Sequence, residues 1–360
     1  MIQIVHVVAA GEIGGAERML LDLVRGDDRH SVALLTPNEA LRALFRENGV
    51  VVDDRGANVK EGPLSYLAST FGSADVAWLA GVLERRRASI VHLHTFASQV
   101  IGTRAAEKVR ARIVRTEHST RVYDDPTCWP FARWSLPRAN AVVFISEHVR
   151  NAAFTKAPFL REPRRDPTVI HNGVDTARFA PAPLRDDVTR FVALGRLDPR
   201  KGLDLALEAL TRVSGATLDI VGTGNHERVL RATVDRLGLR DRARFVGYRD
   251  DVRAAIADAD VVLSSAVTEG LGIAILEAMA MGRPACVVPV GGLVEIVENG
   301  TSGWVATDRS APALAAAMLA ATDRPERERR GLLARKRVEE KFSLEAMRRS
   351  YETVYARVAH

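Results

Sequence analysis

The sequence predicts an α/β protein built from two doubly wound parallel-sheet domains. Short, almost continuously apolar stretches alternate with helix-forming stretches in the first half, as expected for parallel strands covered on both faces. The same alternation starts again after a break over Asn172–Leu184, which contains Pro181 and Pro183. The length of 360 residues exceeds one ordinary core and suits two domains of about 150–200 residues each.

Strands are expected where a short apolar run lies between helix or turn signals. In the first half these runs are Ile2–Ala9, Ser31–Thr36, Val50–Asp53, Ser89–His94, Ala111–Glu117, Ala141–Ser146 and Thr168–His171. In the second half they are Phe191–Leu194, Thr217–Val221, Arg244–Val246, Val261–Ser264 and Ala285–Val288.

Helices are expected between the strands, where residues of high helix propensity gather. They include Ala16–Val24, Ala97–Val109, Leu203–Val213, Glu227–Leu237, Val252–Ala257, Ile273–Met281 and Leu293–Glu298. The helical stretches Ala311–Ala321 and Pro325–Val358 close the chain, the latter interrupted at Phe342–Ser343, where Ser343 can cap a final helix. We assign residues 1–175 to an N-terminal domain, 176–342 to a C-terminal domain and 343–360 to a last helix packing on the N-terminal domain. Asn58–Ser73 receives no role.

Composition is that of a globular protein, with 47% hydrophobic and 27% charged residues. No apolar run reaches the roughly 18–20 residues that span a bilayer. The net charge of +6 is mild, and no recognition motif accompanies it, so we expect no nucleic-acid partner. Cys128 and Cys286 are far apart in sequence, which favours reduced thiols and a cytoplasmic location.

Two glutamates eight residues apart, Glu269 and Glu277, lie in the segment Ser264–Pro284. Glu269 is expected in a strand-to-helix loop and Glu277 about one turn inside the following helix. Gly270 and Gly272 allow close approach of the backbone to a ligand, and the helix start offers free N–H groups to an anion. Two solvated helix carboxylates are the plain alternative.

Two long cations, Arg196 and Lys201, follow the strand end in ALGRLDPRKG. Fixed cations can neutralise the charge that develops on a diphosphate leaving group. Glycines also follow other strands, at Gly14 and Gly15 in GEIGGAER and at Gly222 and Gly224 in DIVGTG. A tight strand-to-helix turn is the alternative for each glycine pair.

Taken together, these motifs resemble the retaining glycosyltransferases of family 4, which have the GT-B fold of two Rossmann-like domains facing a central cleft. The resemblance covers nearly the whole chain and is most specific over 193–304. It implies catalytic roles for Glu269, His118, Arg196 and Lys201, with Glu277 on the ribose. It implies donor binding by Gly195, Arg196, Lys201, Gly222, Gly224, Tyr248, Glu269, Gly270, Leu271, Gly272, Ile273 and Glu277, and an acceptor or phosphate loop at Gly14 and Gly15. Many relatives carry Phe at the position of Leu271.

The activity implied is metal-independent transfer, with retention, from a nucleoside-diphosphate sugar to a hydroxyl of a glycan, glycolipid or small molecule, with UDP the first choice of nucleotide and GDP the second. Alternatives are a nucleotide-sugar 2-epimerase and a non-catalytic nucleotide-sugar-binding protein. His92 and His94 share a strand face, but no nearby carboxylate or cysteine set completes a metal site, so no cofactor is expected. Basic residues at Arg85–Arg87 and at Arg104, Lys108, Arg110, Arg112 and Arg115 leave open a peripheral contact with the inner face of a membrane, an ordinary solvated face being the alternative. The oligomeric state stays open.

Overall fold

The computed structural model describes residues 2–9, 13–56, 72–94, 96–156, 167–183 and 189–359. The chain divides into two compact units: unit 1 comprises Met1–His171 with Met347–His360, and unit 2 comprises Asn172–Ala346. Most of the stretch Asn58–Ser73 lies outside the described residues.

Unit 1 is built on a parallel sheet of seven strands in the order β3-β2-β1-β4-β5-β6-β7. The strands are β1 (Ile4–Val8), β2 (His30–Leu34), β3 (Val51–Asp54), β4 (Ile90–Leu93), β5 (Arg112–Glu117), β6 (Ala141–Phe144) and β7 (Thr168–Val169). β1, β4 and β6 are buried along their whole length, so both faces of the sheet are covered.

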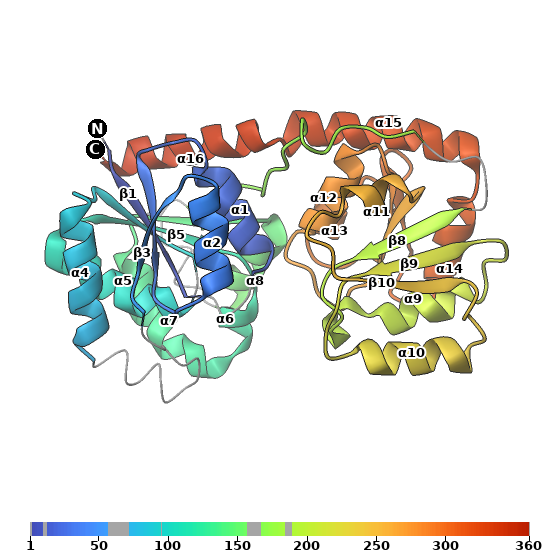
Figure 1. Ribbon diagram of the computed structural model, residues 1–360, viewed down its shortest axis with the longest axis horizontal. Coiled ribbons are helices and arrows are strands. Elements are labelled where there is room, and N and C mark those ends of the chain that lie inside the picture. Colours follow the sequence, from blue (N-terminus) through green and yellow to red (C-terminus); the bar gives the residue numbers. More distant parts are fainter. Residues whose placement is uncertain are drawn as a thin grey trace. The chain divides into compact units, whose positions relative to one another are not determined.

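The helices of unit 1 fill the intervals between these strands (Figure 1). They are α1 (Gly15–Val24), α2 (Glu39–Glu47), α4 (Ala74–Arg85), α5 (Phe96–Val109), α6 (Arg121–Asp124), α7 (Trp129–Ser135) and α8 (Glu147–Lys156), with 3-10 turns at Pro126–Cys128 and Leu136–Arg138. From Met347 onward, α16 (Leu344–Ala359) also belongs to this unit, and its Tyr351 and Tyr355 lie buried against the central strands.

Unit 2 is built on a parallel sheet of six strands in the order β10-β9-β8-β11-β12-β13. The strands are β8 (Arg190–Leu194), β9 (Thr217–Val221), β10 (Ala243–Gly247), β11 (Val261–Ser264), β12 (Ala285–Val287) and β13 (Gly303–Val305). The short edge strand β13 was not expected from the sequence.

The helices of unit 2 lie on both faces of its sheet, α9, α10 and α14 on one and α12 and α15 on the other (Figure 1). They are α9 (Leu203–Leu210), α10 (Glu227–Arg236), α11 (Arg253–Ala257), α12 (Ile273–Ala280), α13 (Leu293–Ile296), α14 (Ala311–Ala320) and α15 (Arg324–Lys341). The predicted interruption after α15 is confirmed, since the Ser343 hydroxyl accepts a hydrogen bond from Ala346 N at 3.3 Å at the start of α16.

The strand order reverses once in each sheet, between β1 and β4 in unit 1 and between β8 and β11 in unit 2. The connections that leave two such neighbouring strands diverge and leave a crevice at the carboxyl ends, which is where doubly wound sheets bind ligands. The site residues predicted from the sequence are therefore expected at these two reversal points, at the carboxyl ends of the two sheets.

Candidate active site

Lys201 and Glu269 form an ion pair at the carboxyl end of the unit 2 sheet. Lys201 ends the 3-10 turn η5 (Pro199–Lys201) after β8, and Glu269 lies in the loop between β11 and α12. Lys201 Nζ lies 2.7 Å from Glu269 Oε2, and the two side chains keep 32% and 20% of their surface exposed. The pair bridges the two loops that leave the strands at the reversal point, so it lies where a ligand of this sheet is expected.

Backbone segments around this pair approach each other too closely for side chains. An added Cβ at Gly222 would lie 2.0 Å from the carbonyl oxygen of Gly195, and one at Gly224 would lie 2.2 Å from that of Leu197. Gly195 and Gly222 have φ angles of +134° and +137°, which residues with a side chain rarely adopt. Glycine at these positions therefore packs the loops after β8 and β9 together beside the Lys201–Glu269 pair.

The segment after Glu269 leads directly into α12, as the sequence predicted. Gly272 precedes the helix with a φ of +103°, and Glu277 is its fifth residue. The Leu271 side chain is 1% exposed, so only the main chain of this residue is available to a ligand. Substitution of Phe by Leu here thus changes the core beneath the loop.

Tyr248 and Arg196 occupy exposed positions at the same end of the sheet. Tyr248 follows β10 and is 56% exposed. The Gly222 N–H donates to the Gly247 carbonyl at 2.9 Å, which ties the end of β9 to the residue before Tyr248. Arg196 lies in the loop after β8, next to Gly195.

In unit 1, Gly14 precedes α1 and takes part in a capping box. The Glu17 carboxylate accepts a hydrogen bond from Gly14 N at 2.8 Å, and Glu17 is 8% exposed. This contact explains the glutamate of the GGAE sequence as a helix cap. It also occupies the Gly14 N–H, so a phosphate or acceptor bound at this loop would have to use Gly15 and the residues after it.

His118 directly follows β5, at the carboxyl end of the unit 1 sheet. Its Nε2 lies 3.1 Å from His94 Nδ1, whereas its Nδ1 is buried and has no hydrogen-bond partner among the described residues. Loss of hydration lowers the pKa of His118 to about 4, so the ring is neutral at pH 7. A neutral imidazole with one unpartnered nitrogen can accept or donate one hydrogen bond to a ligand.

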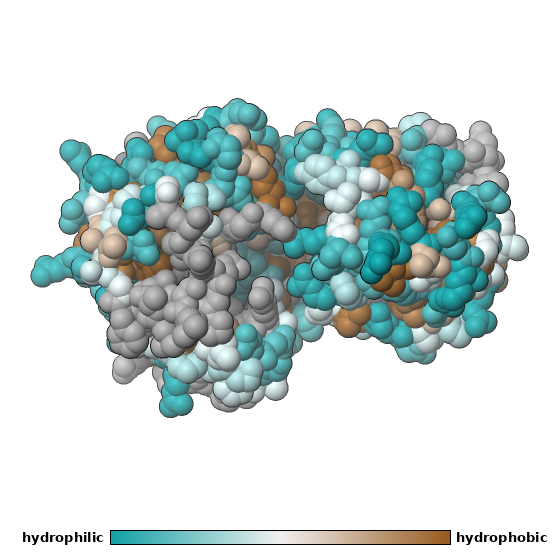
Figure 2. Space-filling model, turned by 60° about the horizontal axis from the view of Figure 1, so that its bottom comes forward, coloured by the Kyte–Doolittle hydropathy of each residue, from teal (hydrophilic) through white to brown (hydrophobic). Residues whose placement is uncertain are grey.

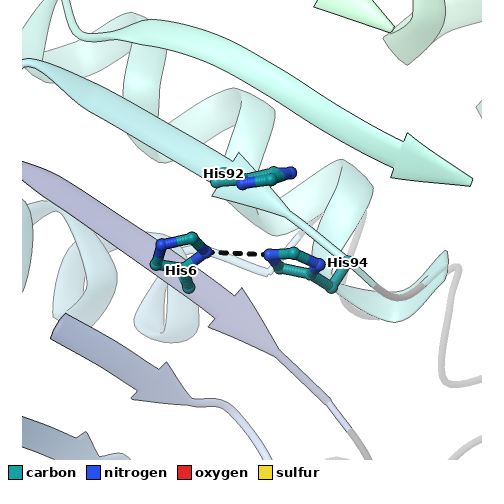
Figure 3. Close-up of side chains that lie close together, drawn as sticks. All are labelled: His6, His92 and His94. Atoms are coloured by element: carbon teal, nitrogen blue, oxygen red, sulfur yellow. Dashed lines mark hydrogen bonds between the residues drawn. The ribbon is translucent and has the colours of Figure 1, made fainter. Parts of the chain in front are cut away.

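Sequence reasoning missed two further histidines of unit 1, His6 and His30. His6 lies beside His92 in the register of β1 and β4, and Figure 3 shows His6, His92 and His94 gathered on one side of these strands. A histidine inside each of two adjacent buried strands was the signal for this cluster.

The rings of His6, His92 and His94 lie close enough to be considered as metal ligands, within 4.8 Å of one another. Both nitrogens of each ring already have hydrogen-bond partners: His92 bonds Tyr355 and Thr116, and His6 and His94 bond each other and further histidines. A cation would have to break these buried bonds to bind. The donor set thus fits a hydrogen-bonded cluster better than a metal centre.

The basic residues considered for membrane contact do not form one surface. Arg115 is 1% exposed and pairs with buried Glu117, so it cannot contribute to a basic face, and its inclusion was wrong. Lys108, Arg110 and Arg112 are exposed, but Lys108 and Arg110 precede β5 and Arg112 is its first residue, so all three lie at the amino end of the sheet. Arg86 pairs with Asp53, with Arg86 Nε 2.8 Å from the carboxylate.

Among the described residues, no helix is both long and apolar enough to cross a bilayer. On the face shown in Figure 2, the coloured residues are mostly hydrophilic, and hydrophobic residues gather only in small patches.

Comparisons with known proteins cover both units. The family model described as Glycosyltransferase Family 4 matches residues 13–178, and the model described as Glycosyl transferases group 1 matches 188–324. The putative colanic acid biosynthesis glycosyltransferase WcaL of Escherichia coli K12 is 35% identical over 167 residues, which are 42% of this chain and 41% of WcaL. The aligned part thus spans less than half of that relative.

Two other similarities extend further along the chain. N-acetyl-alpha-D-glucosaminyl L-malate synthase of Bacillus anthracis is 25% identical over 77% of each chain. The crystal structure of Anabaena Alr3699/HepE in complex with UDP and glucose has a TM-score of 0.86 at 22% identity, covering 99% of this chain and 100% of HepE.

Proposed function

Because the chain belongs to the family 4 glycosyltransferases, we propose that it transfers a sugar from a nucleoside-diphosphate sugar to a hydroxyl of an acceptor. The predicted GT-B fold is confirmed by its two doubly wound sheets and by the likeness to HepE. The single observation that carries the proposed chemistry is the Lys201–Glu269 pair, which bridges the two loops at the reversal point of the unit 2 sheet.

In the proposed reaction the bond between the anomeric carbon and the diphosphate breaks, and a bond to the acceptor oxygen forms on the same face of the sugar. The acceptor proton passes to the leaving diphosphate. Lys201 and Arg196 stabilise the negative charge that develops on the diphosphate. Because this charge is largest as the bond breaks, a fixed cation stabilises the transition state more than the ground state.

Glu269 has a double role in this proposal. Before the donor binds, its carboxylate holds the Lys201 ammonium in place at 2.7 Å. With donor bound, the diphosphate competes for that ammonium, and Glu269 becomes available to accept hydrogen bonds from sugar hydroxyls. Glu277, one turn inside α12, is assigned to the ribose hydroxyls.

UDP is the first choice of nucleotide and GDP the second. The solved structures of HepE, with bound UDP, glucose or UDP-glucose, support the order, because their fold is the same over the whole chain. The acceptor is proposed to be a glycan, glycolipid or small molecule that binds to unit 1, and no metal ion is required because fixed cations supply the positive charge.

The experiment that tests the function is a donor screen followed by a transfer assay. Thermal unfolding is measured with UDP-, GDP-, ADP- and TDP-sugars, and a donor at 100 times its dissociation constant should stabilise the protein by about 2.7 kcal/mol. The stabilising donor is then incubated with and without candidate acceptors, and the products are identified by NMR at the anomeric proton.

Release of nucleoside diphosphate together with a retained glycoside supports the proposal. Formation of an epimerised donor without acceptor would identify an epimerase, and binding without any turnover of the donor, hydrolysis included, would identify a non-catalytic binder. A rate that collapses in EDTA and returns with Mg²⁺ or Mn²⁺ would overturn the metal-free part.

A further inference from the structure

Four histidines of unit 1 form a continuous chain of hydrogen bonds that ends at His118. His118 Nε2 lies 3.1 Å from His94 Nδ1, His94 Nε2 lies 2.9 Å from His6 Nδ1, and His6 Nε2 lies 2.7 Å from His30 Nδ1. Figure 3 shows the central bond, between His6 on β1 and His94 just beyond β4. Neighbouring rings in the chain have centroids 5.0 to 5.4 Å apart.

Each ring in the chain carries a single proton at neutral pH. Burial lowers the pKa of His6 and of His94 well below the ordinary value, and it also lowers the pKa of His30 and of His118. A neutral imidazole has one N–H and one bare nitrogen. Every bond in the chain therefore points the same way, and the tautomer of one ring determines the tautomers of the others.

Charged groups at the outer end decide the direction. His30 Nε2 lies 3.6 Å from Asp27 Oδ2, and a Glu352 oxygen lies within 4.8 Å of a His30 ring nitrogen. Arg29 binds both carboxylates, and Arg348 and Tyr355 are the other polar groups near the His30 ring. A carboxylate can only accept a hydrogen bond. A proton on Nε2 faces Asp27 favourably, whereas a bare Nε2 would place a lone pair against a negative charge.

This direction propagates to the other end. With the proton of His30 on Nε2, His30 Nδ1 accepts from His6, His6 accepts from His94, and His94 accepts from His118. All four rings then carry their proton on Nε2, and His118 Nδ1 is left bare. That nitrogen is the buried atom that has no hydrogen-bond partner among the described residues.

We propose that Asp27, His30, His6 and His94 are positioning residues that hold His118 as a hydrogen-bond acceptor at Nδ1. The ligand group that fits this nitrogen is a hydroxyl, which can donate, and not a phosphate or carbonyl oxygen, which cannot. Its assignment to a hydroxyl of a sugar or acceptor rests on the proposed function.

The chain acts by orientation and not by conducting protons during turnover. A proton passed from His118 to Asp27 would leave every ring protonated on Nδ1 and the Asp27 carboxyl protonated. Once that carboxyl lost its proton to solvent, a bare His30 Nε2 would face a carboxylate. The two inner rings, His6 and His94, are hydrogen-bonded through both nitrogens and cannot turn over easily to reset. The arrangement instead resembles the role of the carboxylate in a catalytic triad, which holds an imidazole in one tautomer.

The test is ¹⁵N NMR of the ring nitrogens in the ligand-free, full-length protein, with His118 signals identified by their loss in His118→Asn. Wild-type protein is expected to show all four rings protonated on Nε2. Asp27→Asn, at a partly exposed site, should shift His118 towards the other tautomer or a mixture. The control Asp28→Asn removes the same charge from the exposed neighbouring residue and should leave His118 unchanged.

A His118 proton on Nδ1 in the wild type would overturn the proposal, and so would a His118 ring unaffected by a folded Asp27→Asn protein. If transfer activity is found, Asp27→Asn should lower kcat/KM by about 2- to 10-fold, the effect of one disoriented hydrogen bond. Asp27→Glu should restore it. An inactive protein with the expected tautomers would refute the proposed function but not the proposed orientation of His118 by the histidine chain.

Discussion

Replacing Lys201 by methionine separates a catalytic ion pair from a structural one. Methionine keeps an unbranched side chain over Gly195 but removes the ammonium. Because the pair's side chains are 32% and 20% exposed, its contribution to the free energy of unfolding should be about 0–1 kcal/mol. A cation that stabilises the leaving diphosphate contributes much more to the rate, about 10²- to 10³-fold in kcat for one such group.

The expected result is therefore a loss of turnover of about 10²-fold or more with a change in unfolding free energy of no more than about 1 kcal/mol. Turnover is measured with the donor that stabilises the protein, and stability by urea unfolding. Arg200→Met is the matched control, because Arg200 is the neighbouring residue and pairs with Asp198 at 2.9 Å on the same turn. It should leave turnover within about 3-fold of wild type.

Glu269→Gln removes the negative charge of the same ion pair. It releases the Lys201 ammonium, so bare nucleoside diphosphate should bind at least as tightly as to wild type, whereas transfer should be slow. A Lys201→Met protein that loses less than about 5-fold in turnover would refute the reasoning, since a loss of about 1 kcal/mol is all that the structural pair explains. Equal losses in Lys201→Met and Arg200→Met would point to general disturbance of the loop.

Three further predictions follow from the same structure. Glu277→Ala should weaken binding of bare nucleoside diphosphate in calorimetry, because its carboxylate is assigned to the ribose; unchanged affinity would remove it from the site. Gly222→Ala should lower the free energy of unfolding of unit 2 by more than about 2 kcal/mol in urea unfolding, because φ is +137° and the new Cβ meets a backbone oxygen at 2.0 Å. The control Gly215→Ala has a φ of +71° and open space around the new Cβ, so it should lower the free energy of unfolding by only about 1 kcal/mol. Equal losses in the two variants would contradict the packing argument. Acid should destabilise unit 1 before unit 2. The pKa values of His6, His30, His92, His94 and His118 in the folded state are below the unfolded value of about 6.5, so the unfolded state binds more protons below that pH. Stability should therefore fall from pH 6.5 towards 4 by up to about 1.4 kcal/mol per pH unit for each histidine. Hydrogen exchange followed by mass spectrometry resolves the two units, and equal acid sensitivity of both would contradict this.

The membrane hypothesis is weakened by where the basic residues lie. Lys108 precedes β5 and Arg112 is its first residue, so both lie at the amino end of a sheet whose ligands are expected at the carboxyl end. If these residues bound a bilayer, an acceptor anchored in it would lie at the amino end of the sheet, away from the expected site. Co-sedimentation with liposomes of anionic and neutral lipid should therefore show no pelleting that depends on anionic lipid; such pelleting at low salt would revive the hypothesis.

The local pattern of the sequence was sufficient for the fold class. Strands such as Val261–Ser264 were predicted to the residue, because a short apolar run between a helix and a glycine-rich loop has few alternative structures. The place of Glu269 before α12 and of Glu277 inside it followed from the same local signals. Edge strand β13 was not predicted, because it begins with a glycine, which weakens the local strand signal, and its pairing with β12 is a tertiary contact.

The sequence by itself thus determined the two doubly wound units, the loops that carry the site and the residue types in them, since these depend on neighbours along the chain. Only the tertiary structure decided which loops meet. Lys201 and Glu269 are 68 residues apart, and they pair because the strand order places β8 beside β11. The histidine chain likewise needs β2, β1, β4 and β5 side by side, with charged groups of the α1–β2 turn and of α16 at its outer end. Such contacts depend on strand order and register, and one sequence contains no local signal for either.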